Sequence, residues 1–262
     1  MIKSVDKALR LLEILSQSDR PMRLRDISDA SGLTRSNAFR MLQTLRDLGY
    51  VQQNGDGSYY DLTLKLFEVS ARKVASNSLV SAAHPILQRL SEHVTENVML
   101  SVREDLTSVV IDRIESRAFV RTFAYLGARA PLHTVSGGKV LLAYAPDEVV
   151  AAMSQNLVRF TARTITDPDR LAQEIAAIRK RGYATAFHEI NEAARGVAVP
   201  IRSRHGDVVA ALSISGPMED LSDELIGDFV AFLKEHAALI ERAWPGTNQG
   251  AGLSSVPRPS SA

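Results

Sequence analysis

The sequence predicts an α+β protein of two domains, and three observations support this prediction. The chain has 262 residues, of which 45% are hydrophobic and 23% charged, a composition typical of soluble globular proteins. The N-terminal part shows helical periodicity followed by turn residues that favour a hairpin. Strand-type segments separated by helices follow, which is typical of a mainly antiparallel sheet with helices packed on it.

Two amphipathic helices are predicted at the N-terminus. The first presents apolar side chains at helical spacing along one face: Val5, Ala8, Leu9, Leu12 and Leu15. Pro21 marks a break, and the second, short helix has Leu24, Ile27 and Ala30 on its apolar face. Gly32 then suits the end of this helix, because glycine adopts the left-handed conformation of a C-cap.

A third helix and a hairpin complete the N-terminal domain. Thr34 can cap the helix start, Gly49 stops it after Leu48, and its apolar face consists of Ala38, Met41, Leu42, Leu45 and Leu48. Residues 50–53 and 58–61 are predicted strands around Asn54-Gly55-Asp56-Gly57, a sequence that favours a tight turn. Three helices followed by a hairpin predict a winged helix-turn-helix.

The outward face of the third helix is chemically suited to DNA. It carries Arg40, which matches guanine in the major groove, and Gln43, which matches adenine. The predicted DNA-binding residues on and around this face are Arg23, Arg25, Thr34, Arg35, Ser36, Asn37, Phe39, Arg40 and Gln43. A solvated polar face on an ordinary amphipathic helix is the alternative interpretation. The predicted wing has no Lys or Arg at its tip, so a basic minor-groove contact is not predicted there.

Charge permits nucleic-acid binding without establishing it. The net charge is +1, and residues 1–78 hold roughly twelve Lys and Arg against nine Asp and Glu. There is no cysteine, and the N-terminus carries charges where a signal peptide needs an apolar core. Apolar runs are too short to span a bilayer. We therefore expect a cytoplasmic protein without membrane contact, disulfide or thiolate metal site.

The remaining elements follow from periodicity and turn residues. Residues 62–77 predict a connecting helix with Leu62, Leu66 and Val69 on one side. Further predicted helices are 82–93, 136–145, one from Asp167-Pro168 to Gly182, and 222–244; predicted strands are 97–102, 108–114, 120–123, 196–201 and 208–215. The expected domains are the winged helix (1–61), a linker helix (62–78), an α+β domain (79–245) and a disordered tail (246–262).

Several separated motifs resemble the IclR family of bacterial transcription regulators. They are Ser4-Val5-Asp6-Lys7-Ala8-Leu9, residues 31–45 (SGLTRSNAFRMLQTL), Gly49-Tyr50-Val51, residues 131–143 (PLHTVSGGKVLLA), Arg181-Gly182-Tyr183, Ala198-Val199-Pro200-Ile201 and residues 211–217 (ALSISGP). The resemblance implies a GAF-like effector domain from about residue 79, and homodimers or dimers of dimers on partly palindromic operators. It also implies regulation of catabolic operons by a small carboxylic acid, with RNA polymerase as a further partner and without a cofactor.

The resemblance and local chemistry together predict the effector pocket. The N-terminus of the helix at Ser136-Gly137-Gly138 offers free N–H groups to a carboxylate, and Ser213 and Ser215 alternate with apolar residues on one strand. The predicted effector-binding residues are Phe119, Arg121, Thr122, Ala130, Ser136, Gly137, Ala186, Arg195, Gly196, Ser213 and Ser215. His188 and Glu189 are further polar candidates, and for His133 a structural hydrogen bond is favoured.

Two departures from the family pattern bear on the effector. Glyoxylate-type members have an acidic residue at the position of Ala186 and a cysteine at that of Gly196. The smaller side chains predict a larger, less polar pocket for a bulkier acid, and the segment from Arg195 to Pro200 resembles that of members responding to aromatic acids. Drift at unused positions is the alternative explanation.

Catalysis and metal binding are not predicted. Ser136-Gly137-Gly138-Lys139 fits the S-x-x-K pattern, but the companion motifs of β-lactamases are missing, and the stretch is not a Walker A loop. Six scattered histidines show no ligand spacing. The remaining alternative is a GAF-like binding module without DNA activity, against which the predicted winged helix argues.

Overall fold

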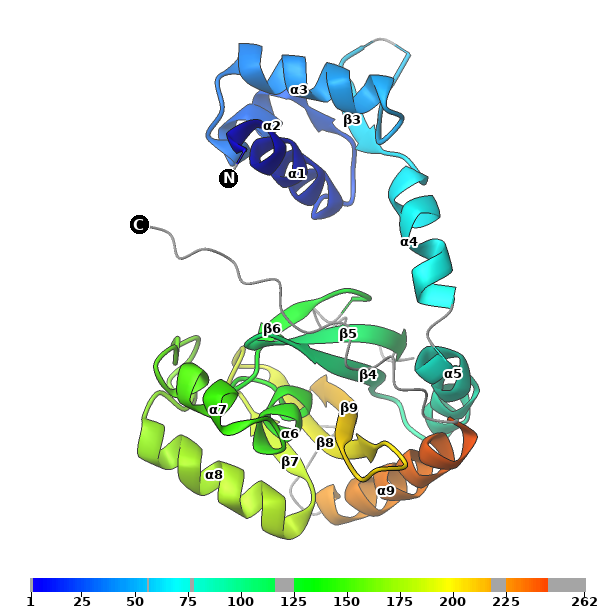
Figure 1. Ribbon diagram of the computed structural model, residues 1–262, viewed down its shortest axis with the longest axis vertical. Helices are drawn as coiled ribbons and strands as arrows, with labels where there is room; N and C mark the ends of the chain where they lie inside the picture. Colours follow the sequence, from blue (N-terminus) through cyan, green and yellow to red (C-terminus); the bar gives the residue numbers. More distant parts are fainter. Residues whose placement is uncertain (1, 56, 76–77, 116–124, 218–224, 245–262) are drawn as a thin grey trace. The chain divides into compact units, whose positions relative to one another are not determined.

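The computed structural model describes residues 2–55, 57–75, 78–115, 125–217 and 225–244. It divides into two compact units, Met1–Ser76 and Asn77–Ala262, each of which is described by itself (Figure 1). The α+β fold class predicted from the sequence is confirmed: the first unit combines helices with a three-stranded sheet, and the second combines helices with a six-stranded antiparallel sheet.

The N-terminal unit has the predicted order of three helices and a hairpin. Its elements are α1 (Lys3–Ser16), β1 (Met22–Arg23), α2 (Leu24–Ser31), α3 (Arg35–Asp47), β2 (Val51–Gln53), β3 (Tyr59–Leu62) and α4 (Lys65–Ala75). The predicted caps are present: Gly32 has φ 67° after α2, and the side chain of Thr34 accepts a hydrogen bond from the backbone N–H of Asn37. Gly49 has φ 81° just beyond α3, where a left-handed residue ends the helical path.

The core of this unit corrects several predicted positions. Leu11, Leu12 and Leu15 are the buried residues of α1, whereas Val5 and Leu9 are 52% and 54% exposed. The helix therefore packs against α2 and α3 through a face rotated from the predicted one. Ala30 is exposed on α2.

The ends of two elements also differ from prediction. Leu48 is 58% exposed, because α3 ends at Asp47 and the chain turns away from the core. Leu62 belongs to β3, where it pairs with Val51, and Val69 is exposed on α4. The short strand β1 was not predicted; its two residues pair with Tyr59 and Tyr60 of β3.

The C-terminal unit is built on one sheet in the order β6-β5-β4-β9-β8-β7, with every neighbouring pair antiparallel. Its strands are β4 (Asn97–Glu104), β5 (Thr107–Ile114), β6 (Arg129–Pro131), β7 (Ala184–Phe187), β8 (Ala194–Arg202) and β9 (Val208–Pro217). Its helices are α5 (Ser78–Ser91), α6 (Ser136–Ala143), α7 (Asp147–Ser154), α8 (Pro168–Arg181) and α9 (Ile226–Ala243).

Some elements of this unit differ from those predicted. The helix expected over 82–93 begins at Ser78 and contains Pro85, while β6, α7 and β7 were not predicted. Short elements such as the three-residue β6 carry too little periodicity to be recognised. The strand expected over 120–123, the start of the helix expected at 222 and the tail 246–262 lie outside the described residues.

The two faces of the sheet carry side chains of very different size. One face presents large apolar residues such as Leu100, Leu212 and Ile214, which pack against α5 and α9 in one core. The other presents mostly small residues, among them Ala198 and Ala211, which pack against α6 and α8 in a second core. Figure 1 shows α5 and α9 on one side of the sheet and α6, α7 and α8 on the other. Small side chains on the α6 side leave room for a cavity.

Candidate functional site: the outward face of α3 and a cavity beside α6

Helix α3 presents an outward polar face in the N-terminal unit. Arg35, Ser36, Asn37 and Arg40 are exposed, while Ala38, Leu42 and Leu45 anchor the opposite face in the core. The guanidinium groups of Arg35 and Arg40 have no hydrogen-bond or ion-pair partner among the described residues. Phe39 is 44% exposed beside them, and Gln43 is half-buried. This face offers donors to an approaching nucleic acid.

The two arginines predicted before and on α2 already have partners. Arg23 donates from Nε and Nη2 to the hydroxyl of Tyr59, at 3.0 and 2.7 Å, and its guanidinium lies 5.0 Å from the Tyr59 ring centroid. Arg25 lies 3.7 Å from Asp29 in an exposed pair. Arg23 therefore connects the start of α2 to strand β3, which carries Tyr59. The sequence did not predict this role.

The hairpin that forms the wing is held by its own side chains. Asn54 accepts a hydrogen bond from the backbone N–H of Tyr59 at 2.8 Å, and Gly57 has φ 72°. Gln53 donates to the carbonyl of Gly57 and receives a hydrogen bond from Arg46 at the end of α3. The wing is thus tied to the helix that precedes it.

A cavity of about 230 Å³ lies on the small-residue face of the C-terminal sheet, beside the N-terminus of α6. The predicted residues that line it are Ala130, Ser136, Gly137, Ala186, Arg195, Gly196, Ser213 and Ser215. The six strands β4 to β9 and helix α6 thus all contribute residues to the lining of this cavity. The other three predicted residues, Phe119, Arg121 and Thr122, lie outside the described residues.

The start of α6 is buried and available for an anion. Val135 is the N-cap residue and makes no side-chain cap hydrogen bond. The first N–H groups of a helix lack partners within it, so those of Ser136 and Gly137, which line the cavity, suit a carboxylate. A methyl group on Gly137 would lie 3.7 Å from the Cβ of Ala211, an ordinary contact that shows how closely the helix approaches β9.

Gly196 lines the cavity and lies close to the side chain of Ser136. A methyl group on residue 196 would lie 2.9 Å from Oγ of Ser136 and 3.4 Å from the carbonyl oxygen of Ile214. The side chain of Ser136 therefore takes up part of the space next to this glycine. Ala186 also lines the cavity as a small residue, and the enlargement of the pocket by these two residues stays a prediction.

A buried ion pair stands beside the cavity. Nζ of Lys139 lies 2.6 Å from Oε1 of Glu189 and donates to the carbonyl of Thr185 at 3.2 Å, and both charged side chains are almost completely buried. Burial raises the pKa of Glu189 above its ordinary value, although the Lys139 ammonium opposes this shift. Oε2 of Glu189 has no hydrogen-bond partner among the described residues.

Arg195 and the two histidines have distinct surroundings. Arg195 lines the cavity with its guanidinium 3.7 Å from the centroid of the Phe187 ring, a cation–π contact on a buried side chain. His188 turns its Nδ1 to the carbonyl of Glu192 and does not line the cavity. His133 has the structural hydrogen bond that the sequence favoured, with Nε2 3.0 Å from the carbonyl of Val158.

Several cavity residues were not predicted. Ser101 and Ser108 lie on β4 and β5 and face the same space as Ser213, because Ser101 pairs with Ala211 and Met99 pairs with Ser213 across the sheet. Alternation along residues 97–102 places Ser101 opposite the core face of its strand, so the pattern that identified Ser213 and Ser215 could have identified it as well.

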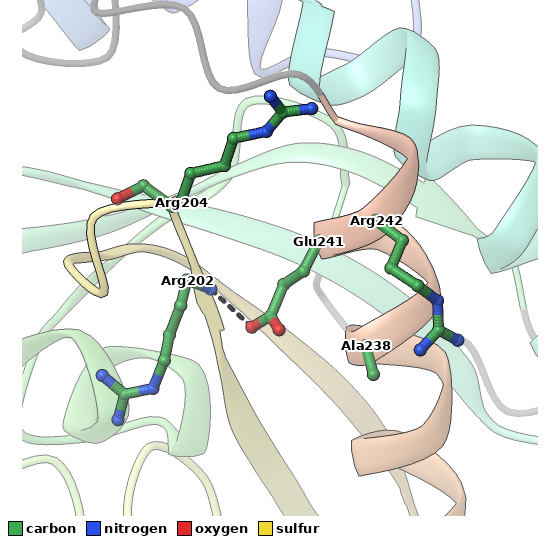
Figure 2. Close-up of a pocket in the computed structure, with 6 residues that line it drawn as sticks. Arg202, Arg204, Ala238, Glu241 and Arg242 are labelled. Carbon is green, nitrogen blue, oxygen red and sulfur yellow. Dashed lines mark hydrogen bonds between the residues drawn. The ribbon is translucent and has the colours of Figure 1, made fainter.

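A second pocket, of about 270 Å³, lies between the β8–β9 turn and α9 (Figure 2). Its lining includes Arg202, Arg204 and Arg242, and Glu241 accepts a hydrogen bond from the backbone N–H of Arg202 at 2.7 Å. Figure 2 shows the three guanidinium groups pointing in different directions. They do not converge on a common anion.

Two kinds of structural feature are absent from the part of the chain that the structure describes. None of its helices is long and apolar enough to cross a membrane. Within the same residues, no group of three or more His, Cys, Asp or Glu side chains is arranged to hold a metal ion.

The chain matches two family models that together span most of its length. Residues 4–55 match the model described as the IclR helix-turn-helix domain. Residues 71–242 match the model described as the C-terminal domain of the bacterial transcriptional regulator IclR. The two matches correspond to the two compact units of the structure.

Individual relatives cover nearly the whole chain. The HTH-type transcriptional regulator KdgR of Escherichia coli (strain K12) is 34% identical over 241 residues, 91% of each chain. The acetate operon repressor of Salmonella typhimurium is 30% identical, over 94% of this chain and 91% of its own length. The crystal structure of an IclR homolog complexed with 4-hydroxybenzoate, from Microbacterium hydrocarbonoxydans, is 30% identical with a TM-score of 0.79, covering 92% of this chain and 98% of that one.

Proposed function

Since the chain belongs to the IclR family and is a DNA-binding transcription regulator, we propose that it binds a partly palindromic operator through α3 and that a small carboxylic acid in the C-terminal cavity changes its operator affinity. Two features carry this proposal. One unit has an exposed face whose arginines have no partner among the described residues, and the other has a cavity beside the N-terminus of α6.

The DNA-binding role of individual residues follows from the geometry of α3. Arg40 and Arg35 lie on the exposed face without a partner among the described residues, and their guanidinium groups can reach a guanine edge or a phosphate. Thr34, Ser36 and Asn37 stand at the N-terminal end of the helix, which suits phosphate contacts. Arg23 and Arg25 contribute less under this proposal, since Tyr59 and Asp29 occupy their charged groups.

The effector is proposed to be an acid large enough to carry a ring. Its carboxylate accepts hydrogen bonds from the first N–H groups of α6, and Arg195 supplies a positive charge in the same cavity. Apolar side chains such as Met99, Val110 and Ile190 supply surfaces for a ring. The relative solved with 4-hydroxybenzoate supports an aromatic acid as the first class to test.

The proposed function also includes an oligomeric state, a class of regulated genes, a protein partner and a cellular location. A partly palindromic operator requires two copies of α3 related by a two-fold axis, so we propose a homodimer or a dimer of dimers. The regulated genes are proposed to form a catabolic operon, as the name of the acetate operon repressor indicates for that relative. We further propose contact with RNA polymerase, a cytoplasmic location and no catalytic activity.

The test is an anisotropy titration of the purified full-length protein against labelled DNA from upstream of its own gene and of neighbouring genes. Salt is held constant, because nucleic-acid affinity depends steeply on it. The titration is repeated with a panel of aromatic and short aliphatic acids. Specific binding that one acid strengthens or weakens is expected.

Three outcomes would contradict parts of the proposal. Weak binding that is equal for all DNA sequences would contradict the role of α3 in sequence recognition. Specific DNA binding that no acid changes, together with no acid bound in calorimetry, would contradict the effector role of the cavity. Acid binding without DNA binding would favour a ligand-binding module with another output.

A further inference from the structure

We propose that the effector carries hydroxyl groups remote from its carboxylate, and that serines on the sheet side of the cavity recognise them together with Glu189. This inference rests on the proposed function of the cavity as an acid-binding site, and it specifies the chemistry of the acid. It concerns Ser101, Ser108 and Ser213, which lie on β4, β5 and β9.

These three serines are buried but have unused hydroxyl groups. Ser101, Ser108 and Ser213 are 4%, 4% and 2% exposed, and all line the cavity. Within the described ranges, none of their hydroxyls makes a hydrogen bond, and the same holds for Ser136 at the start of α6. Four hydroxyl groups of buried serines, none with a partner among the described residues, therefore surround one space.

The other buried hydroxyls of the described residues are paired. Thr134, Thr161 and Thr164 donate to the carbonyl oxygens of Pro131, His188 and Glu189, and Ser28 donates to that of Leu33. This contrast is informative because buried polar groups in folded proteins are nearly always hydrogen-bonded. Among the described buried residues, the hydroxyls without a protein partner thus belong to serines that line the cavity, and their partner must come from outside the chain.

The missing partner is best supplied by hydroxyl groups. A serine hydroxyl both donates and accepts, so another hydroxyl can satisfy it in either direction. An unsubstituted ring or alkyl chain filling the cavity would displace water and leave these groups unpaired, which lowers its affinity. A site built to hydrogen-bond a ligand hydroxyl discriminates strongly against the analogue that lacks it.

Glu189 provides a fifth polar group that lines the cavity and has an atom without a partner among the described residues. Lys139 engages Oε1, whereas Oε2 has no partner among the described residues, and the residue lines the cavity while 8% exposed. A carboxylate oxygen is an acceptor, so the complementary ligand group is a donor such as a hydroxyl. The Lys139 ammonium balances the charge of Glu189, so that the cavity can still accept an anionic ligand at the α6 end.

The shared chemistry is that of a hydroxylated carboxylic acid, which can be aromatic or aliphatic. The experiment uses two matched pairs of acids on the full-length protein: 4-hydroxybenzoate with benzoate, and gluconate with hexanoate. Isothermal titration calorimetry measures the affinity of each. In at least one pair, the hydroxylated acid is expected to bind about tenfold or more tightly than its partner, as for one or two gained hydrogen bonds. The pair that shows the difference identifies the aromatic or the aliphatic source.

Variants of the sheet serines connect the preference to these residues. S101A, S108A and S213A each remove one hydroxyl without adding bulk. At least one is expected to reduce the hydroxylated acid's affinity severalfold and to maintain or raise that of the unhydroxylated acid, which no longer leaves this hydroxyl unpaired. S154A is the matched control, because Ser154 lies on α7 and its hydroxyl already donates to the carbonyl of Val150. Unchanged preferences in all three cavity variants would overturn the proposal.

The remaining outcomes separate this inference from the proposed function. If neither hydroxylated acid binds more tightly than its partner, and benzoate or hexanoate binds and alters operator binding, the effector role stands and the hydroxyl inference is wrong. If none of the four acids binds and none alters operator binding, the acid-binding role fails and the hydroxyl inference fails with it. Circular dichroism of each variant verifies that lost binding does not reflect lost folding.

Discussion

A methyl group on Gly138 would lie 2.6 Å from the carbonyl oxygen of Leu132 and 2.9 Å from its Cα. The first turn of α6 therefore rests directly on the backbone of the segment before it. Neither partner can yield by rotating a side chain, because both contacts involve backbone atoms. The position of the helix start at the cavity thus depends on the absence of a side chain at this residue.

Gly138→Ala is expected to destabilise the C-terminal unit by about 1–3 kcal/mol or more, as overpacking against fixed atoms does. Urea unfolding followed by circular dichroism measures the change in free energy of unfolding. Gly137→Ala is the matched control, since its methyl group would make only ordinary side-chain contacts at 3.7 Å or more. Equal stability of the two variants would contradict the assigned contact.

Gly196→Ala is expected to displace the side chain of Ser136 and lower stability by about 1–3 kcal/mol. The double variant S136G/G196A removes the hydroxyl that the new methyl group meets at 2.9 Å. It should recover part of the lost free energy of unfolding, because residues in contact are not additive. A double variant as unstable as the sum of the two single variants would show that the two residues do not compete for space.

Lys139→Met is expected to destabilise the protein by about 3–5 kcal/mol, because it leaves the buried carboxylate of Glu189 without its counter-charge. K139M/E189M should recover much of this loss by replacing the pair with apolar side chains. Lys65→Met is the control: Lys65 pairs with Glu68 on an exposed surface at 3.3 Å, where a loss below about 1 kcal/mol is expected. Chemical denaturation of the three variants provides the comparison.

His133 should make stability sensitive to mild acid. Burial lowers the pKa of His133 below its ordinary value of 6.5, with the nearby Lys139 charge acting in the same direction. The unfolded chain then takes up a proton before the folded one does. The contribution of His133 is therefore complete above pH 6.5 and is lost as pH falls through the folded-state pKa.

The corresponding measurement compares the wild type with His133→Gln, whose amide can still donate to the carbonyl of Val158. Thermal or urea unfolding from pH 7.5 to 5 should show a steeper loss of stability in the wild type. Glu189 is present in both proteins, so its titration cancels in the difference. Parallel pH profiles would indicate that His133 is protonated equally in both states.

Arg40→Ala is expected to lower operator affinity by about 1–3 kcal/mol without affecting folding, since its exposed guanidinium has no partner within the described residues. Anisotropy titration at matched salt measures this loss. Arg10→Ala removes a charge of the same sign from α1, where Arg10 pairs with Asp6, and should have a smaller effect. Similar losses in both variants would indicate general electrostatic attraction rather than a specific contact.

The features that the sequence predicted correctly are those that depend on residues adjacent in the chain, such as helix caps and helix ends. Thr34 caps α3, and Gly32 and Gly182 end helices in the left-handed conformation, because each needs only its neighbours in sequence. The alternation of Ser213 with Leu212 likewise placed one residue on each face of β9. The segment from Ser136 to Lys139 marked the helix start at the cavity.

Other features depend on partners far away in sequence. The space beside Gly196 is partly taken up by Ser136, sixty residues earlier in the chain, and no local pattern indicates this. Arg23 contacts Tyr59 rather than standing free, because β1 pairs with β3. Leu11 rather than Leu9 enters the core, since the rotation of α1 is set by the helices that it packs against.

The unlike faces of the C-terminal sheet have a consequence for how such a protein can diversify. Along β9, Leu212 and Ile214 support the core shared with α5 and α9, whereas Ser213 and Ser215 line the cavity. Under the proposed function, neighbouring residues on one strand are therefore selected separately, one set for folding and the other for ligand choice. Substitutions at alternate positions would then change what the cavity binds while the core packing remains intact, so that new effector responses would arise by single substitutions within an unchanged fold.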